Sequence, residues 1–508
     1  MTVRIGERLS LDQVVAVAFG EAVELPRAAA ERMQRSRAVV DRVVETGATV
    51  YGVTTGFGSL ADVRIRPEQA NDLQHAILRS HATPVGPLLS SAEARAMLLL
   101  RAHVLALGHS GVRVAIVERM LDMLNHDIVP AVPEQGSLGA SGDLAPLASL
   151  ALPLIGEGRV LDGAGATDAA GALATAGLAP LSLEAKEGLA LVNGTQGMLA
   201  IGVLAASRVR SLCAAADVAA AMTIEAALGT DRPFDERLQA LRPHAGQAAS
   251  AANLRRLLAG SGITASHRES EHLVQDAYSL RCAPQVHGAT RDVLAFASGV
   301  LEIEAGSISD NPIVLPDTAD VVSGGNFHGQ PVAVALDALA LSVVPLASIA
   351  ERRLFRLLDP RSNNGLPAFL VRESGLNSGL MLAQYTAASL VSEMKTLAHP
   401  ASVDSIPSSA GQEDHVSMGM TSARHARDVV ASAEVVVALE ILAAAQGLDL
   451  RAPLRAAPGT AAALEAVRTV VAPLEVDRDL GPDIAVTTAA VRDGTIVAAV
   501  EAAVGALA

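Results

Sequence analysis

Long apolar segments made of strong helix formers are the feature that most restricts how this chain can fold. They cover residues 92–107, 197–228, 332–358 and 421–446. Ser90 and Glu93 form a capping-box signature before the first segment, and Gly108 follows it at the position of a C-terminal glycine. Pro345 predicts a kink within the third segment. Helices that are apolar on all sides belong in the centre of a large core, so these segments predict a helical bundle.

Strand signals are short and few, at residues 3–5, 159–161 and 313–315. The sequence therefore predicts a mostly α fold, with a long central helical bundle and a smaller N-terminal α+β part. We expect an N-terminal domain over residues 1–195, a central long-helix bundle over 196–450 and a C-terminal helical segment over 451–508. Several helices that are apolar all round need more covering surface than one subunit offers, which favours an oligomer.

Charge and hydropathy exclude two classes of partner. The 508 residues include 39 Lys and Arg against 54 Asp and Glu, a formal net charge of −15. Phosphate backbones are bound by clustered basic residues, so we expect no nucleic-acid partner. Asp337 and Pro345 interrupt the longest apolar stretch, residues 332–350, which favours the core of a soluble bundle over a membrane span.

The N-terminus and the cysteines indicate a cytoplasmic protein. Residues 1–13 lack the uninterrupted apolar segment of a secretory signal. The two cysteines, Cys213 and Cys282, show no CxxC or metal-ligand spacing. This usage suits a reducing compartment, and we expect no metal site.

Segments rich in glycine and turn residues separate the helices at 51–59, 130–142, 307–329 and 401–411. The most informative stretch contains Ala140, Ser141 and Gly142. One interpretation is a glycine-rich turn in which Ser141 or Asp143 caps the following helix. A hydrolase nucleophile elbow fails on spacing, because it needs glycine two residues after its serine and Asp143 occupies that place.

A third interpretation uses all three small residues. In a tightly bent backbone the Gly142 amide nitrogen can attack the Ala140 carbonyl, because glycine lacks the Cβ that would block the approach. Loss of one water from the new ring, and of the Ser141 hydroxyl as a second water, leaves an exocyclic methylidene. This group is a strong electrophile, and no ordinary side chain supplies one.

Residues 136–150, GSLGASGDLAPLASL, resemble the aromatic amino acid ammonia-lyase family over fifteen positions. The resemblance extends over about residues 51–450. Family members form a methylidene-imidazolone (MIO) group from an internal Ala-Ser-Gly, which implies an MIO made from Ala140, Ser141 and Gly142 and no external cofactor. The resemblance also implies a homotetramer with sites assembled from several subunits. It further implies a helical architecture like that of the fumarase and aspartase group, whose GSSxMPxKxNP signature this chain lacks.

The resemblance assigns roles in two further segments. Tyr51 lies in YGVTTGFG, which lacks the lysine of a phosphate loop and is expected to be a mobile loop. By itself Tyr51 could be a packing residue, but the resemblance makes it the base that removes the β-proton. Asn193 lies in LVNGTQ, where by itself it could be a helix cap. The resemblance makes Asn193 a residue that positions the electrophile or the substrate carboxylate.

Gln275, Tyr278 and Arg281 lie in QDAYSLR, which matches another family segment. Tyr278 and Arg281 are three residues apart and share one face of a helical turn. Arg281 could be an ordinary surface arginine, but a guanidinium also suits bidentate binding of a carboxylate. The resemblance makes Arg281 the anchor of the substrate carboxylate, with Gln275 and Tyr278 lining the site. Whether Tyr51 or Tyr278 takes the proton stays open.

Three residues indicate the substrate ring. Phe327 lies in the glycine turn SGGNFH, and the resemblance places it against the ring. His81 follows Ser80 as in the members that act on L-histidine, where this histidine lies by the ring. Residues 412–415, QEDH, look like a metal cluster, but consecutive residues of a helix point in different directions. The resemblance instead makes Glu413 the partner of an imidazole, whose N–H groups a carboxylate can accept.

These motifs predict the non-oxidative deamination of L-histidine to trans-urocanate and ammonia, a step of histidine degradation. Thr83, Pro84 and Gly411 depart from the family's usual residues near the pocket, which leaves the substrate preference open. The alternatives are a tyrosine or phenylalanine ammonia-lyase, or an aminomutase that uses the same MIO group. A non-catalytic binding homologue is disfavoured, because every proposed catalytic position holds the expected residue type.

Overall fold

The computed structural model describes residues 2–163, 165–269 and 274–508. Helices dominate these residues, and their strands form four two-stranded sheets. The mostly α fold predicted from the sequence is confirmed. The long predicted segments correspond to α4 (Ser91–Ala106), α9 (Gln196–Ala226), α15 (Gln330–Leu358) and α17 (Gly419–Leu450). Helix α15 continues through Pro345.

The chain divides into two compact units. Unit 1 comprises Met1–Leu204, Ala297–Asp337 and Pro400–Arg424, and unit 2 comprises Ala205–Phe296, Ala338–His399 and His425–Ala508. Four of the boundaries fall inside α9, α14 (Ala283–Ala305), α15 and α17. Each unit is therefore a compact group of contacting residues that comes from three separate stretches of the chain. The division of the sequence at residues 195 and 450 stays a prediction.

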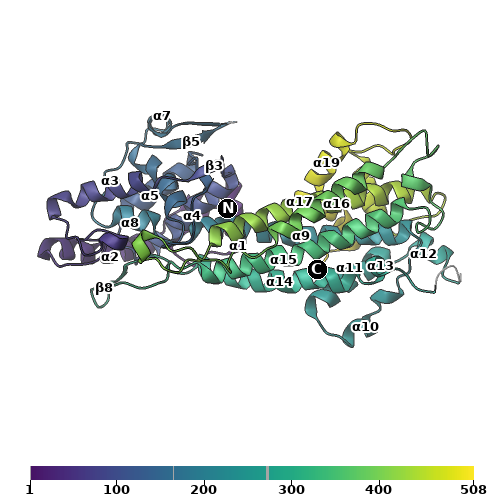
Figure 1. Cartoon of the computed structure of the whole chain (residues 1–508), viewed down its shortest axis with the longest axis horizontal. Helices are drawn as coiled ribbons and strands as arrows, with labels where there is room; N and C mark the ends of the chain where they lie inside the picture. The colour runs from purple at the N-terminus through teal and green to yellow at the C-terminus, as the bar shows by residue number, and fades with distance from the viewer. Residues whose placement is uncertain (1, 164, 270–273) are drawn as a thin grey trace. The chain divides into compact units, whose positions relative to one another are not determined.

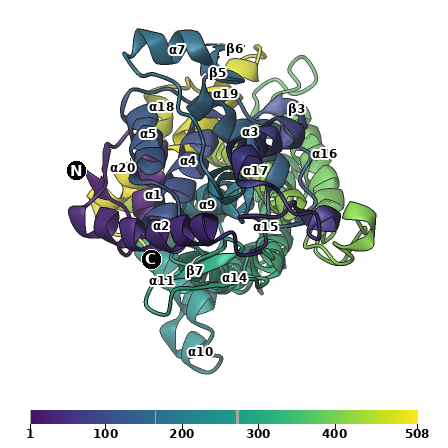
Figure 2. The same ribbon diagram turned by 90° about the vertical axis from the view of Figure 1, so that its left-hand side faces the viewer.

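Helix α4 is the central helix of the N-terminal part of unit 1. It packs against α1 (Leu11–Ala18), α2 (Arg27–Thr46) and α5 (Val114–Asn125) (Figure 2). The predicted capping box is present: the Ser90 hydroxyl accepts the Glu93 amide, and the Glu93 carboxylate accepts the Ser90 amide at 2.8 Å. Nearly every residue of α4 is buried, including Arg101. Its charged side chains therefore have to find partners inside the unit.

Short strands shape the loops of unit 1. β1 (Val3–Arg4) pairs in parallel with β2 (Val23–Glu24), and β5 (Arg159–Asp162) pairs antiparallel with β6 (Gly165–Asp168). β3 (Val85–Leu88) and β4 (Pro133–Gln135) pair directly before residues 136–142, and β7 (Ile313–Leu315) pairs with β8 (Asp320–Val322). The strand signals in the sequence correspond to β1, β5 and β7. The remaining helices and 3-10 turns of unit 1 are α3 (Ala70–His81), α6 (Leu144–Ala151), α7 (Ala169–Thr175), α8 (Glu187–Val192), η1 (Gly58–Leu60), η2 (Pro67–Gln69), η3 (Leu152–Ile155) and η6 (Ser409–Gly411).

Buried charged side chains join the parts of α9, α14, α15 and α17 that belong to unit 2, where these helices run side by side (Figure 1). Asp217 of α9 and His287 of α14 share a hydrogen bond of 2.7 Å. Arg353 of α15 lies 3.4 Å from His287 and donates to the Glu440 carboxylate of α17 at 2.5 and 2.8 Å. All four side chains are 0% exposed. Each helix thus supplies a buried polar side chain that has to find a partner on its neighbours.

The other elements of unit 2 surround these long helices. They are η4 (Arg232–Phe234), α10 (Glu236–Ala240), α11 (Ala245–Leu258), α12 (Gly262–Ser266), α13 (Tyr278–Arg281), η5 (Ala368–Leu370), α16 (Met381–Leu397), α18 (Pro458–Arg468), α19 (Gly481–Arg492) and α20 (Thr495–Val504). Helices α9 and α15 are long and apolar enough to cross a membrane, but their most apolar stretches are each 67% buried inside the structure. Such burial is typical of core helices.

Candidate active site

One cavity of unit 1 brings the glycine-rich segments together. It has a volume of about 490 Å³. Three of the glycine-rich segments, and residues 412–416 directly after the fourth, line it. Its wall includes Tyr51, Ser141, Asn311, Phe327 and Glu413. Loops that the sequence separates by hundreds of residues therefore share one space.

Two further cavities adjoin the first. One of about 540 Å³ shares Tyr51, Ser141 and Glu413 with it and adds His81 and Asn193. Another, of about 220 Å³, is lined by His81 and Glu413 together with Ala140 and Gly142 on either side of Ser141. The structure thus gathers around Ser141 the predicted site residues Tyr51, His81, Ala140, Gly142, Asn193, Phe327 and Glu413.

The backbone of the Ala-Ser-Gly tripeptide is tightly bent. Ser141 and Gly142 have positive φ values of 50° and 81°. Gly194 pairs with this bend: its amide donates to the Ser141 carbonyl at 3.1 Å, and its carbonyl accepts the Asp143 amide at 2.7 Å. A Cβ on Gly142 would lie 2.1 Å from the Gly194 carbonyl oxygen. Only glycine fits at position 142 in this bend, as the cyclisation chemistry requires.

Asp143 does not cap the helix that follows it. It occupies the N-cap position of α6, but its side chain makes no capping bond there. Instead its carboxylate accepts the Ser137 hydroxyl and the Met198 amide, each at 2.8 Å. Burial raises the pKa of Asp143 to about 6, although these hydrogen bonds act in the opposite direction. The carboxylate therefore connects the bent tripeptide to the first turn of α9.

Asn193 is held from two sides at the end of α8. Its side-chain amide donates to the Asn311 carbonyl at 2.7 Å, and its own carbonyl accepts Arg101 Nη1 at 2.6 Å. Burial lowers the pKa of Arg101 to about 10. Asp310, directly before Asn311 in the chain, forms a buried ion pair of 2.8 Å with Lys186. Asn193 Oδ1 is buried and has no hydrogen-bond partner among the described residues, so it is available to a group bound at Ser141.

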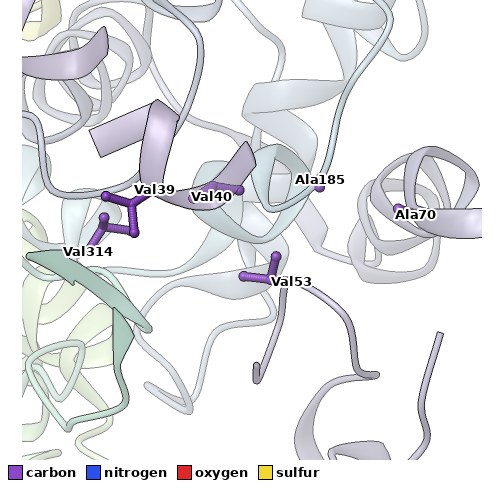
Figure 3. Close-up of a cluster of buried hydrophobic side chains, with 6 residues drawn as sticks. All are labelled: Val39, Val40, Val53, Ala70, Ala185 and Val314. Carbon is purple, nitrogen blue, oxygen red and sulfur yellow. The ribbon is translucent and has the colours of Figure 1, made fainter. Parts of the chain in front are cut away.

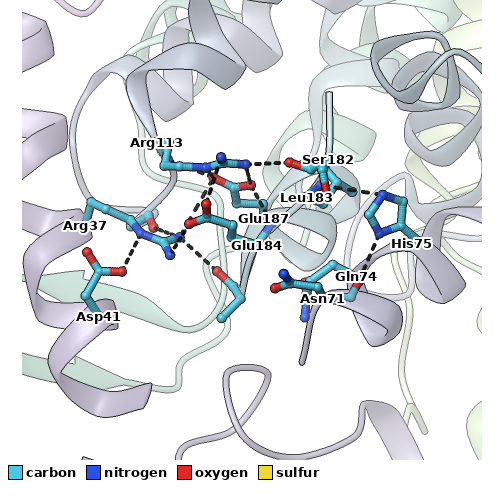
Figure 4. Close-up of polar contacts among 12 residues, drawn as sticks. Arg37, Asp41, Asn71, Gln74, His75, Arg113, Ser182, Leu183, Glu184 and Glu187 are labelled. Atoms are coloured by element: carbon cyan, nitrogen blue, oxygen red, sulfur yellow. Dashed lines mark hydrogen bonds and ion pairs between the residues drawn. The ribbon is translucent and has the colours of Figure 1, made fainter. Parts of the chain in front are cut away.

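Ion pairs fix the segment that leads into α8 (Figure 4). Arg113 donates to the buried Glu187 carboxylate at 2.8 and 2.7 Å and to the Ser182 carbonyl at 2.6 Å. Arg37 of α2 donates to Glu184 at 2.9 Å. These contacts attach residues 182–187 to neighbouring elements and fix the N-terminal end of α8, whose other end is followed by Asn193.

The Tyr51 loop is anchored on one side. Val53 is fully buried among Val39, Val40 and Val314 (Figure 3). Residues 52–56 are all buried, whereas residues 59 and 60 are exposed. The Tyr51 hydroxyl accepts the Gly58 amide at 3.3 Å. The mobility expected of this loop stays a prediction. Because residues 52–56 are buried, we expect movement only in the remaining part of the loop.

His81 is the last residue of α3, and Glu413 lies in the turn before α17. The two side chains lie near each other. Burial lowers the pKa of His81, opposed by a hydrogen bond to the Ile77 backbone and by the charge of Glu413. The Ser80 hydroxyl lies 3.0 Å from His81 Nδ1. Glu413 accepts the Ser408 hydroxyl at 2.6 Å. Both side chains line two of the cavities, so both can meet one ligand.

The segment 412–415 differs from expectation in its backbone. Exclusion of a metal cluster on sequence grounds assumes a helix at these residues, but they form a turn and an irregular stretch, because Ser408 and Glu413 pair as a short bridge. Phe327, His328 and His415 line the first cavity, and the two histidine rings lie 5.9 Å apart. No group of three or more metal-ligating side chains occurs among the described residues.

Gln275, Tyr278 and Arg281 belong to unit 2. Tyr278 and Arg281 begin and end α13, and the guanidinium lies 4.7 Å from the centre of the Tyr278 ring. The shared face predicted from their spacing is confirmed. The Tyr278 residue is 71% exposed. The cavities around Ser141 take all their lining residues from unit 1.

Sequence reasoning missed several supporting residues. Arg101 and Asn311 hold Asn193, and Ser408 holds Glu413. A charged residue inside the apolar run of α4 was the available signal for Arg101, since a buried arginine needs partners. Asn311 carries no comparable signal, because its contact with Asn193 depends on how distant loops meet. Ser408 carries none either, because its contact with Glu413 depends on the conformation of the turn between them.

Comparison with known proteins gives consistent matches over the whole chain. A family model described as aromatic amino acid lyase matches residues 9–469. The histidine ammonia-lyase of Symbiobacterium thermophilum is 53% identical over 99% of both chains. That of Anaeromyxobacter dehalogenans is 55% identical, over 97% of this chain and 98% of the relative.

Solved structures agree with these matches. The histidine ammonia-lyase from Trypanosoma cruzi superposes with a TM-score of 0.92 at 44% identity, covering 99% of this chain and 96% of the other. The tyrosine aminomutase from Streptomyces globisporus superposes with a TM-score of 0.96 at 40% identity, covering 100% of both chains. The helical fold is therefore the same in enzymes with different substrates.

Proposed function

This chain belongs to the aromatic amino acid lyase family, and we propose that it is a histidine ammonia-lyase, which converts L-histidine to trans-urocanate and ammonia. The resemblance seen in the sequence is confirmed. The curated histidine ammonia-lyases named above are 53% and 55% identical over nearly the whole chain. The observation that carries the choice of substrate is Glu413, a carboxylate beside His81 in the cavity wall.

We propose that Ala140, Ser141 and Gly142 form an MIO group. The bent backbone and the missing space for a Cβ at Gly142 fit a cyclisation in which the Gly142 nitrogen bonds to the Ala140 carbonyl carbon. Two waters leave, one from the ring and one from the Ser141 side chain. When formed, this group supplies an electrophile that activates the substrate amine as a leaving group. The unpartnered Asn193 Oδ1 fits a role in orienting the group or the substrate.

We propose that Tyr51 removes the β-proton. Tyr51 lines both large cavities together with Ser141, which supports contact with a substrate bound there. A free phenol has a pKa of about 10 and needs neighbouring dipoles or charges to act near neutral pH. In this structure the Gly58 amide donates a hydrogen bond to the Tyr51 hydroxyl at 3.3 Å.

Glu413, His81 and Phe327 are proposed to bind the ring. A carboxylate accepts the N–H groups of imidazole, whereas a phenyl ring would leave its charge unpaired. The lowered pKa of His81 favours its neutral form, which can share hydrogen bonds with the ring without repelling a cation. Phe327 supplies an apolar face in the wall of the first cavity.

Gln275, Tyr278 and Arg281 are proposed to complete the site from another subunit of a homotetramer, with Arg281 binding the substrate carboxylate. Tyr278 is exposed, and so are apolar residues on the long helices, such as Phe296, Leu341 and Phe355. This exposure supports the association of this chain with other subunits. We also propose a cytoplasmic location, which the free Cys213 and Cys282 suit.

The test compares turnover of L-histidine, L-tyrosine and L-phenylalanine by the purified protein. We expect urocanate, seen as growing ultraviolet absorbance, with kcat/KM for L-histidine at least about 100-fold above the others. The high structural similarity to a tyrosine aminomutase makes that activity the second candidate. Formation of β-tyrosine without urocanate would establish it instead, whereas a hydroxyphenyl acrylate without urocanate would indicate a tyrosine ammonia-lyase.

A further inference from the structure

A tight turn presents Glu413 to the cavities. Ser408 and Glu413 close it through two backbone hydrogen bonds, of 3.0 Å from the Ser408 amide and 3.3 Å from the Glu413 amide. Ser409, Ala410 and Gly411 between them have positive φ values of 50°, 54° and 86°. Consecutive residues rarely adopt this conformation. The turn therefore holds positions 408 and 413 side by side.

The two side chains also meet. The Ser408 hydroxyl donates to Glu413 Oε2 at 2.6 Å, while Oε1 has no hydrogen-bond partner among the described residues. Hydrogen bonds to an ionised carboxylate are roughly twice as strong as those between neutral groups. A carboxylate can accept about four hydrogen bonds, so one occupied oxygen leaves ample capacity for a ligand. Ser408 thus fixes one oxygen and leaves the other free.

We propose that Ser408 is a positioning residue for substrate recognition, which holds the Glu413 carboxylate so that it accepts a ring N–H of bound L-histidine. This inference rests on the proposed function. Without the hydroxyl, the Glu413 side chain gains rotational freedom that binding has to remove. The ring contact is present both before and during the reaction, so its weakening raises KM and leaves kcat unchanged.

Ser408→Ala tests this role against two matched variants. We expect the KM for L-histidine and the inhibition constant of trans-urocanate, which keeps the ring but lacks the amine, to rise together by about tenfold. The kcat should stay within about twofold. Ser408→Thr keeps the hydroxyl and should restore both constants. Ser307→Ala removes a hydroxyl bonded to the Ile303 carbonyl at 2.6 Å, outside the three cavities, and should change neither.

Several outcomes would overturn the inference. One is an unchanged KM and inhibition constant in Ser408→Ala while Glu413→Gln raises both. Another is a fall in kcat without a rise in KM, which would give Ser408 a different role. An intact mass that retains both waters in Ser408→Ala would show a defect in forming the electrophile instead. Absence of urocanate with the unaltered protein would contradict the proposed function itself, separately from any effect of Ser408.

Discussion

Gly142 is the residue whose conformation matters most to the proposed electrophile. The cyclisation chemistry already requires a residue without Cβ at the attacking nitrogen. The structure adds a spatial reason, because the Gly194 carbonyl oxygen lies where that Cβ would be. One residue therefore satisfies both the reaction and the packing of the loop against the start of α9.

Gly142→Ala should abolish formation of the MIO group. The added Cβ would lie 2.1 Å from the Gly194 oxygen, so the bend has to open. We expect an intact mass that retains both waters, no MIO absorbance in the near ultraviolet, and turnover lower by orders of magnitude. Gly177→Ala is the control, since Gly177 also has a positive φ, of 72°, but nothing within 4 Å. It should cost about 1 kcal/mol and keep the mass loss. Normal turnover in Gly142→Ala would contradict this account.

Local motifs in the sequence pointed to residues that lie together in the structure, while the catalytic roles of these residues stay predictions. The tripeptide, Tyr51, His81 and Glu413 each lie in such a motif, and the structure places them around the same cavities. Asp143 is different: its local sequence indicates a helix cap, but its partners are Ser137 and the Met198 amide. A cap forms only if no better donors approach, and that depends on the tertiary fold.

At the scale of elements, the long helices were predictable and their cross-contacts were not. Apolar helix formers define α9, α15 and α17 almost to their ends. The polar residues inside them gave no indication of partners. Asp217, His287, Arg353 and Glu440 come from four helices and meet only after these have packed. Pairing of this kind depends on helix register, which periodicity alone does not determine.

Arg353→Met should destabilise unit 2 strongly. It leaves the Glu440 carboxylate buried without its arginine, a change that typically costs 3 to 5 kcal/mol, here about 4 kcal/mol. Adding Glu440→Gln should recover much of the loss, because the amide needs no counter-charge and can still accept the Thr223 hydroxyl. Arg361→Met, which breaks the ion pair between the exposed Arg361 and Asp359, should have little effect. Urea unfolding of the four proteins measures the difference. Equal effects of the two arginine substitutions would sink the argument.

At the scale of the whole molecule, the predicted site residues are divided between the two units of the chain. Tyr51 and Ser141 line the same cavities in unit 1, whereas Arg281 belongs to α13 of unit 2. The resemblance of the sequence to the ammonia-lyase family predicted that all three residues belong to one site. Spacing along a chain cannot tell whether two residues act within one subunit or across two, so subunit assembly has to be tested directly.

Mixing two inactive variants provides that test. If Arg281 completes a site on another subunit, tetramers assembled from Tyr51→Phe and Arg281→Met chains should contain some intact sites and regain activity. A mixture of Tyr51→Phe and Ser141→Ala should regain none, because both residues line the same cavity. Each variant alone should stay inactive, by at least about 100-fold. No recovery in the first mixture, despite proven exchange of subunits, would place Arg281 and Tyr51 of one chain in the same site.

The central claim is that an electrophile made from Ser141 drives release of ammonia from L-histidine. The most direct measurement compares urocanate formation by the unaltered protein and by Ser141→Ala, together with their intact masses. We predict that the unaltered protein weighs two waters less than its sequence and forms urocanate. Ser141→Ala should fold normally but lose turnover by orders of magnitude. Near-normal urocanate formation by Ser141→Ala would contradict the account.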